Sequence, residues 1–166
     1  ERVPDRRAML AGATVLALGL LLGFAVTGYQ SLLPLWLILG LGYSLAQTPS
    51  GRLLRRSAHQ EDRPALFAAQ FALSHACWLI TYPLAGWLSA NASPAVTFLV
   101  MGAIASLAVA VAALIWPVSD PNRVAHSHPD LEPGHPHLSS DNGQATNHSH
   151  EFIVDDDHRR WPDRRS

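Results

Sequence analysis

Four apolar stretches alternate with short polar connections along the first two thirds of the chain. They are residues 8–28, 32–54, 65–89 and 95–116, and the last contains the run TFLVMGAIASLAVAVAALIW, which has no polar stripe. A surface helix of a soluble protein carries such a stripe, whereas a helix that crosses a bilayer needs about 20 mostly apolar residues. The pattern therefore predicts four transmembrane helices, with a kink at Pro49 inside the second.

Charged residues indicate how these helices are oriented. Residues 65–116 contain no Asp, Glu, Lys or Arg, and the connections at 28–31 and 90–94 are uncharged. Short loops rich in arginine stay on the cytoplasmic side of a membrane. We therefore expect both ends of the chain to be cytoplasmic, in a multi-pass membrane protein. The arginines concerned are Arg2, Arg6, Arg7, Arg52, Arg55, Arg56 and Arg63.

Composition argues against several other classes of protein. The net charge of −1 provides no strongly basic surface, so we expect no nucleic-acid partner. The single cysteine, Cys77, can form no disulfide within the chain and no cysteine-based metal motif. In or near the apolar stretches there are no paired carboxylates, nucleophile arrangement or phosphate-binding loop, so we expect no enzymatic activity.

Polar side chains are concentrated in the second and third predicted helices. Such groups are costly in hydrocarbon, so they are candidates for lining a water-filled path. His75 is the notable ionisable group: it either relays protons or binds a substrate, or it is a satisfied structural histidine, and the sequence leaves both interpretations open. The candidate residues for the path are Tyr43, Ser44, Gln47, Gln70, Ser74, His75, Thr81 and Tyr82.

Small residues recur at four-residue spacing on the first and fourth predicted helices. Gly19 and Gly23 form one such pair, and Gly102 and Ser106 form the other. This spacing lets helix backbones approach closely. We interpret it as packing within one bundle rather than as a dedicated dimer surface, because such pairs are frequent in multi-span proteins.

The order of apolar, polar, polar and apolar helices resembles the last third of the major facilitator superfamily. The opening ERVPDRRAML, with Asp5, Arg6 and Arg7, is similar to a degenerate copy of that family's cytoplasmic loop motif. The segments GYSLAQTPSGRLLRRSAHQEDRPALFAAQF and WLITYPLAGWL are similar to its loop between helices ten and eleven and to helix eleven. The resemblance implies an all-α, polytopic membrane bundle that supplies helices nine to twelve, over about residues 1–116.

The resemblance also implies a function. The chain would be part of a secondary transporter, which we expect to be a proton-coupled exporter of a small molecule or metal ion that needs no cofactor. Its partners would be the lipid bilayer, the substrate and the missing N-terminal transporter helices, because alternating access requires one half to rock against the other. The alternative is a stand-alone four-helix membrane protein that binds or senses divalent metal through its tail.

Residues 117–166 differ from the rest and are expected to be mostly disordered, since they contain too little apolar surface to form a core. Within them, the closing segment HSHEFIVDDDHRRWP joins Phe152, Ile153 and Val154 to an acidic run and then Trp161, and it is expected to dock on the cytoplasmic face of the bundle or on a partner. Neutral imidazole suits Ni, Zn, Cu and Co, so the histidines form a hypothetical metal site, against the alternative of a solvated polar tail. They are His126, His128, His135, His137, His148, His150 and His158.

Overall fold

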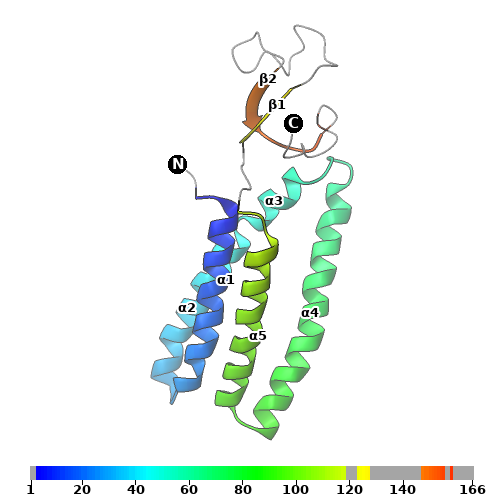
Figure 1. Cartoon of the computed structure of the whole chain (residues 1–166). Helices are drawn as coiled ribbons and strands as arrows, with labels where there is room; N and C mark the ends of the chain where they lie inside the picture. Colours follow the sequence, from blue (N-terminus) through cyan, green and yellow to red (C-terminus); the bar gives the residue numbers. More distant parts are fainter. Residues whose placement is uncertain (1–2, 119–122, 128–146, 156–157, 159–166) are drawn as a thin grey trace.

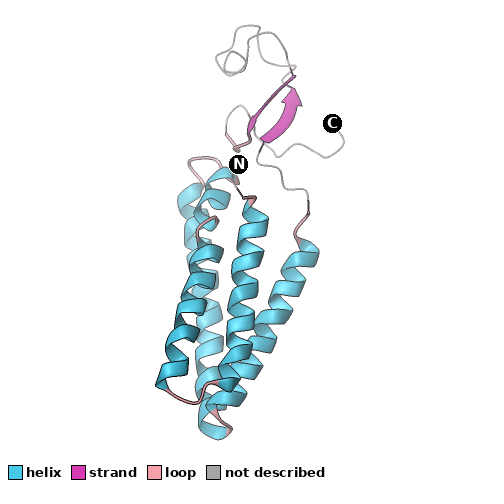
Figure 2. Cartoon of the chain, turned by 90° about the vertical axis from the view of Figure 1, so that its left-hand side faces the viewer, coloured by secondary structure: helices cyan, strands magenta, loops and turns pink. Residues whose placement is uncertain are grey.

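The computed structural model describes residues 3–118, 123–127, 147–155 and 158 of the 166-residue chain. Most of these residues are helical, as Figure 2 shows. In chain order the elements are α1 (Asp5–Leu22), the 3₁₀ turn η1 (Gly23–Ala25), α2 (Tyr29–Gln47), α3 (Ser50–Arg56), α4 (Arg63–Asn91), α5 (Pro94–Ile115), β1 (Arg123–Ser127) and β2 (Asn147–Glu151).

Four helical segments are long and apolar enough to cross a bilayer: Asp5–Ala25, Tyr29–Arg56, Arg63–Asn91 and Pro94–Ile115. They coincide with the four predicted stretches to within a few residues at each end. Local signals set some of these ends. Pro94 occupies the first turn of α5, and the Ser93 hydroxyl caps that helix by accepting a hydrogen bond from the Val96 amide at 3.2 Å. The predicted all-α membrane bundle is confirmed.

The two apolar helices occupy the middle of the bundle. α1 packs against both α2 and α5, and α4 packs against α5, so the order across Figure 1 is α2, α1, α5 and α4. The helices with most polar residues, α2 and α4, therefore lie at the two sides. This spatial order differs from the order along the chain, in which α1 and α5 are the first and last helices.

Glycines bring the central helices close together. A Cβ at Gly12 of α1 would lie 2.5 Å from the Ala46 backbone nitrogen and 2.7 Å from the Gly42 oxygen of α2. The glycines of the predicted small-residue pairs also contact neighbours within the chain: Gly23 lies against Phe98 of α5, and Gly102 lies against Leu21 of α1. These contacts confirm that the small residues serve packing within the bundle.

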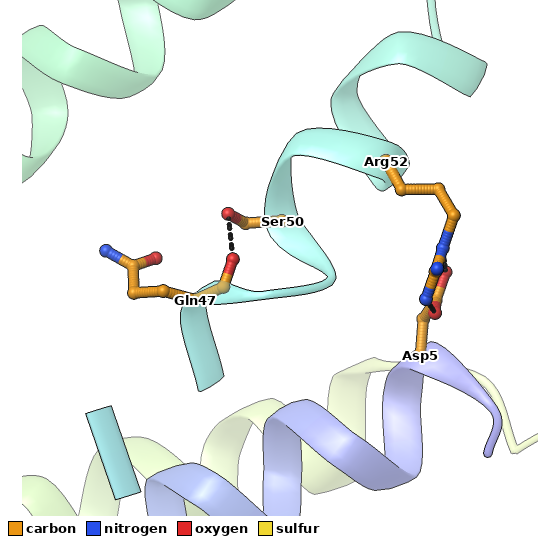
Figure 3. Close-up of polar contacts among 4 residues, drawn as sticks. All are labelled: Asp5, Gln47, Ser50 and Arg52. Atoms are coloured by element: carbon orange, nitrogen blue, oxygen red, sulfur yellow. Dashed lines mark hydrogen bonds and ion pairs between the residues drawn. The ribbon is translucent and has the colours of Figure 1, made fainter. Parts of the chain in front are cut away.

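At Pro49, where a kink was predicted, the helix is interrupted and divides into α2 and α3. α2 ends at Gln47, and Pro49 precedes the first residue of α3. The Ser50 hydroxyl donates to the Gln47 carbonyl oxygen at 2.7 Å (Figure 3), which satisfies one carbonyl at the end of α2. The short α3 then carries Arg52, Arg55 and Arg56 along one end of the bundle, which we call the arginine end.

Ion pairing and capping hold the arginine end together. The buried carboxylate of Asp5, at the start of α1, pairs with the guanidinium of Arg52 in α3 (Figure 3). The next residue, Arg6, donates to the Ala113 oxygen at 2.9 Å and to the Trp116 oxygen at 3.1 Å. A cation at the last carbonyls of α5 is favourable because those groups lack helical partners and carry partial negative charge.

The described part of the tail has structure that its composition did not predict. β1 and β2 form a two-stranded antiparallel ladder in which Arg123 is the partner of Glu151 and Ser127 is the partner of Asn147. Beyond β2, the side chains of Phe152 and Val154 are buried, and the Val154 amide donates to the Arg56 oxygen at 3.0 Å. The expected docking of this segment on the bundle is thus observed, at the C-terminal end of α3.

Candidate functional site

An open groove lies between the two outer helices. It has a volume of about 440 Å³ and is lined by Trp36 of α2, Thr81 and Tyr82 of α4, Leu20 of α1 and Phe98 of α5, among others. Its remaining lining residues include Ser89 and Pro94, so it lies in the half of the bundle away from the arginine end. The groove joins α2 and α4 across a floor made by the apolar pair.

Two of the eight predicted path residues, Thr81 and Tyr82, line this groove. They end two rows of side chains on α4. One row follows the spacing Gln70, Ser74, Cys77 and Thr81, and the other is the aromatic row Phe71, His75, Trp78 and Tyr82. Because residues three and four apart are neighbours on a helix, both rows extend from the groove toward the arginine end.

The path residues of α2 lie on one exposed surface. Tyr43, Ser44 and Gln47 are all exposed, and the Gln47 amide donates to the Tyr43 hydroxyl at 3.3 Å. Tyr43 is seven residues, or about two helical turns, beyond Trp36, so it lies on the helix face that forms one wall of the groove. α2 thus presents an aromatic and amide surface that continues the groove wall.

His75 is held on α4 by its own helix. Its Nδ1 lies 2.8 Å from the Phe71 carbonyl oxygen, and its ring contacts Phe71 and Trp78 with centroids 3.7 and 4.6 Å away. Since a carbonyl oxygen can only accept, Nδ1 carries the hydrogen of the neutral ring. Nε2 is then the acceptor nitrogen, and no residue that the structure describes occupies it.

Two hydroxyls on α4 also bond within the helix. Ser74 donates to the Phe71 oxygen at 2.8 Å, and Thr81 donates to the Cys77 oxygen at 3.0 Å. Such bonds satisfy a hydroxyl donor in an apolar medium without a neighbouring helix. Among the described residues, no hydrogen bond joins a polar side chain of α2 to one of α4. The eight candidates therefore form two separate surfaces, one on α2 and one on α4, rather than one connected cluster.

The predicted loop-motif residues have separate roles in the described structure. Asp5 pairs with Arg52, Arg6 caps α5, and the side chain of Arg7 is exposed. The first two join the start of α1 to α3 and α5, which are remote in sequence. Through these contacts, the motif residues connect α1 to α3 and α5 at the arginine end.

The predicted metal-binding histidines are distributed over different parts of the tail. His126 belongs to β1, and His148 and His150 belong to β2. His158 is buried, with its Nδ1 2.8 Å from Asp155 Oδ1 and its ring 4.8 Å from that of Phe152. His128, His135 and His137 lie outside the described residues. Among the side chains that the structure describes, no group of three His, Cys, Asp or Glu could hold a metal ion.

Sequence reasoning did not select Trp36 or Phe98, both of which line the groove. Aromatic residues in an apolar stretch look the same whether they face lipid, a neighbouring helix or a groove, so the residue type alone gave no signal. The spacing of Trp36 from Tyr43 and Gln47, at seven and eleven residues, was the one available indication.

Four helices of this length and apolar composition indicate a multi-pass membrane protein. The family model described as Major Facilitator Superfamily matches residues 1–146, and the chain belongs to this family. Members of the family are transporters that sit in a lipid bilayer and carry a substrate. No curated protein and no solved structure gives a significant match to the chain.

Proposed function

We propose that this chain forms helices nine to twelve of a proton-coupled exporter in a bacterial inner membrane. The substrate would be a small molecule or a metal ion, and the remaining helices of the transporter would complete the path along α2 and α4. The arginine end would face the cytoplasm, since seven arginines lie in the segments 1–7 and 52–63, and the opposite connections carry none.

The geometry of His75 is the observation that carries the proposal. Its Nδ1 is directed to the Phe71 oxygen at 2.8 Å, which leaves Nε2 as a proton acceptor on the aromatic row that leads to the groove. Histidine serves as a proton shuttle in many proteins, and an ionisable group inside a membrane span marks proton or substrate paths. The proposal therefore assigns proton transfer to Nε2 of His75.

The direct test is proton movement in inside-out vesicles that contain the complete transporter. Ethidium and Ni²⁺ serve as the organic and metal probes, and an acridine dye reports the pH gradient. We expect one of the two probes to dissipate the gradient in the wild type and not in His75→Ala. Leu79→Ala, on the same helix and 78% exposed, is the matched control and should behave as the wild type. A response equal in His75→Ala and wild type, or none to either probe, would contradict the proposal.

The alternative, a stand-alone four-helix protein that senses metal through its tail, has one observation in its favour. The β1–β2 ladder pairs His126 with His148. An antibody against the tail separates the two functions in native membranes. A polypeptide about three times the length of this chain supports the transporter, because twelve helices are needed for both halves. A polypeptide of the length of this chain supports the sensor.

A further inference from the structure

The register of the β1–β2 ladder gathers three histidine positions that are far apart in the sequence. His126 is the direct partner of His148, and Val124 is the partner of His150. Successive residues of a strand alternate between its two faces, so positions 148 and 150 share one face. A directly opposed residue lies on that same face, which adds position 126. The backbone thus places three histidines at adjacent positions on one face.

This spacing suits one metal ion. Directly opposed positions of an antiparallel pair have Cβ atoms about 4.5–5.5 Å apart. An imidazole nitrogen binds Zn²⁺ at about 2.0–2.1 Å, a distance compatible with this spacing of the two backbones. We propose that the β1–β2 ladder is a binding site for a borderline divalent cation such as Zn²⁺, Ni²⁺, Cu²⁺ or Co²⁺, at the positions where its register gathers His126, His148 and His150.

The local spacing of histidines in the sequence would not by itself select this site. By spacing alone, His135 with His137 is as good a ligand pair as His148 with His150. Only the ladder distinguishes them, because it brings His126 opposite His148 across 21 intervening residues. A further bond crosses the ladder: the Arg123 guanidinium of β1 donates to the Ser149 oxygen of β2 at 2.9 Å. The site rests on this pairing and is independent of what the helices transport.

Metal binding at the ladder would also affect the helical bundle, because the ladder is followed directly by the segment that docks on α3. β2 ends at Glu151, and the next residue, Phe152, is 2% exposed. Two residues later the Val154 amide donates to the Arg56 oxygen at the end of α3. A metal ion that joins β1 to β2 would therefore also restrain the docked segment 152–155 against the connection between α3 and α4. His158 is engaged with Asp155 and Phe152, which excludes it from the ladder site.

Two double variants that each remove two histidines test the proposal. The full chain in detergent micelles is titrated calorimetrically with Ni²⁺ and with Zn²⁺. We expect one ion per wild-type chain, and His126→Ala with His148→Ala should weaken binding by at least about tenfold because it removes two ligands. The matched control, His135→Ala with His137→Ala, should retain wild-type affinity. Equal weakening in both variants would show binding spread over the whole tail and would overturn the ladder site, as would an absence of binding to the wild type.

Hydrogen exchange of the Val154 amide tests the link to the bundle. Ni²⁺ should slow exchange of this amide in the wild type and in the His135/His137 variant, because the ordered ladder holds the donor on Arg56. It should have no effect in the His126/His148 variant. Slowing that persists in the His126/His148 variant would place the metal elsewhere and overturn the proposal.

Discussion

α1 and α4 are both apolar spans, yet they are packed in different ways. α1 lies between α2 and α5, and four of its residues, including Gly12 and Ala17, are buried. α4 is longer, at 29 residues, but none of them is buried in the described structure, and its main contact within the bundle is α5. α1 has glycine at its contacts with neighbouring helices, whereas the aromatic row of α4 lies on an exposed surface.

This contrast separates helices that hold the bundle together from helices that present chemistry. Close approach of two backbones depends on small residues and leaves no space for a ligand. The aromatic row of α4 is exposed, and its last member, Tyr82, lines the groove. The surface for which we propose transport chemistry is therefore the loosely packed one, as is usual for elements that bind or move.

We expect the largest change in unfolding free energy from a substitution at the closest contact of α1. In Gly12→Val, the new Cβ would lie 2.5 Å from the Ala46 nitrogen, and a backbone cannot move aside as a flexible side chain can. We expect a loss of about 3 kcal/mol or more in unfolding free energy, at the upper end for overpacked sites. The measurement is unfolding of the full chain in mixed micelles with increasing SDS, followed by tryptophan fluorescence.

Gly86→Val is the matched control for that experiment. Gly86 is also a glycine inside a span, on α4, and a Cβ there would meet nothing within 4 Å. Its substitution should leave the SDS midpoint close to that of the wild type. If the two valine variants were equally unstable, the comparison between a packed α1 and an open α4 would be wrong.

An intermediate effect is expected at the ion pair between α1 and α3. Arg52→Ala leaves the Asp5 carboxylate, whose side chain is 2% exposed, without this guanidinium. The arginine itself is 37% exposed, so solvent screening reduces the loss to about 1–2 kcal/mol. A double-mutant cycle with Asp5→Asn isolates the pair, measured by the same SDS unfolding.

Arg55→Ala is the control for this cycle, because Arg55 lies on the same short helix and is exposed. It should change the unfolding free energy by less than the Arg52 variant does. A coupling energy of zero between Asp5 and Arg52 would show that the pair is incidental to the arginine end.

The spans and the break at Pro49 could be predicted because both depend on local properties, hydrophobic length and the missing proline amide. The contact of Gly12 with Gly42 could not, since it depends on which helix faces which. The partners of Arg6 could not be predicted either, because they lie 107 and 110 residues away in the sequence. The residue itself was identified from the loop motif near the start of the chain. For His75, the sequence identified the residue, and the structure added the orientation of its ring.

The tail shows even more clearly that contacts between segments remote in sequence could not be predicted. Its composition contains no strand signal, and His126 pairs with His148 although 21 residues lie between these two positions. Docking of the segment after β2 was predictable, because Phe152, Ile153 and Val154 are apolar in a polar tail. The place where it docks, the Arg56 carbonyl, follows only from the fold.

The smallest effect is expected on the outer surface of α4. Leu79 is 78% exposed, so Leu79→Ala removes little buried area and should change the unfolding free energy of this chain by less than about 0.5 kcal/mol. Leu21→Ala is its counterpart on α1, where the leucine contacts the Gly102 position of α5, and it should cost several times as much. Measured together, the two variants compare the same chemical change on the packed and the open helix. A large loss from Leu79→Ala would mean that this side of α4 is covered in micelles, for example by a second copy of the chain, and that its openness belongs to the isolated chain alone.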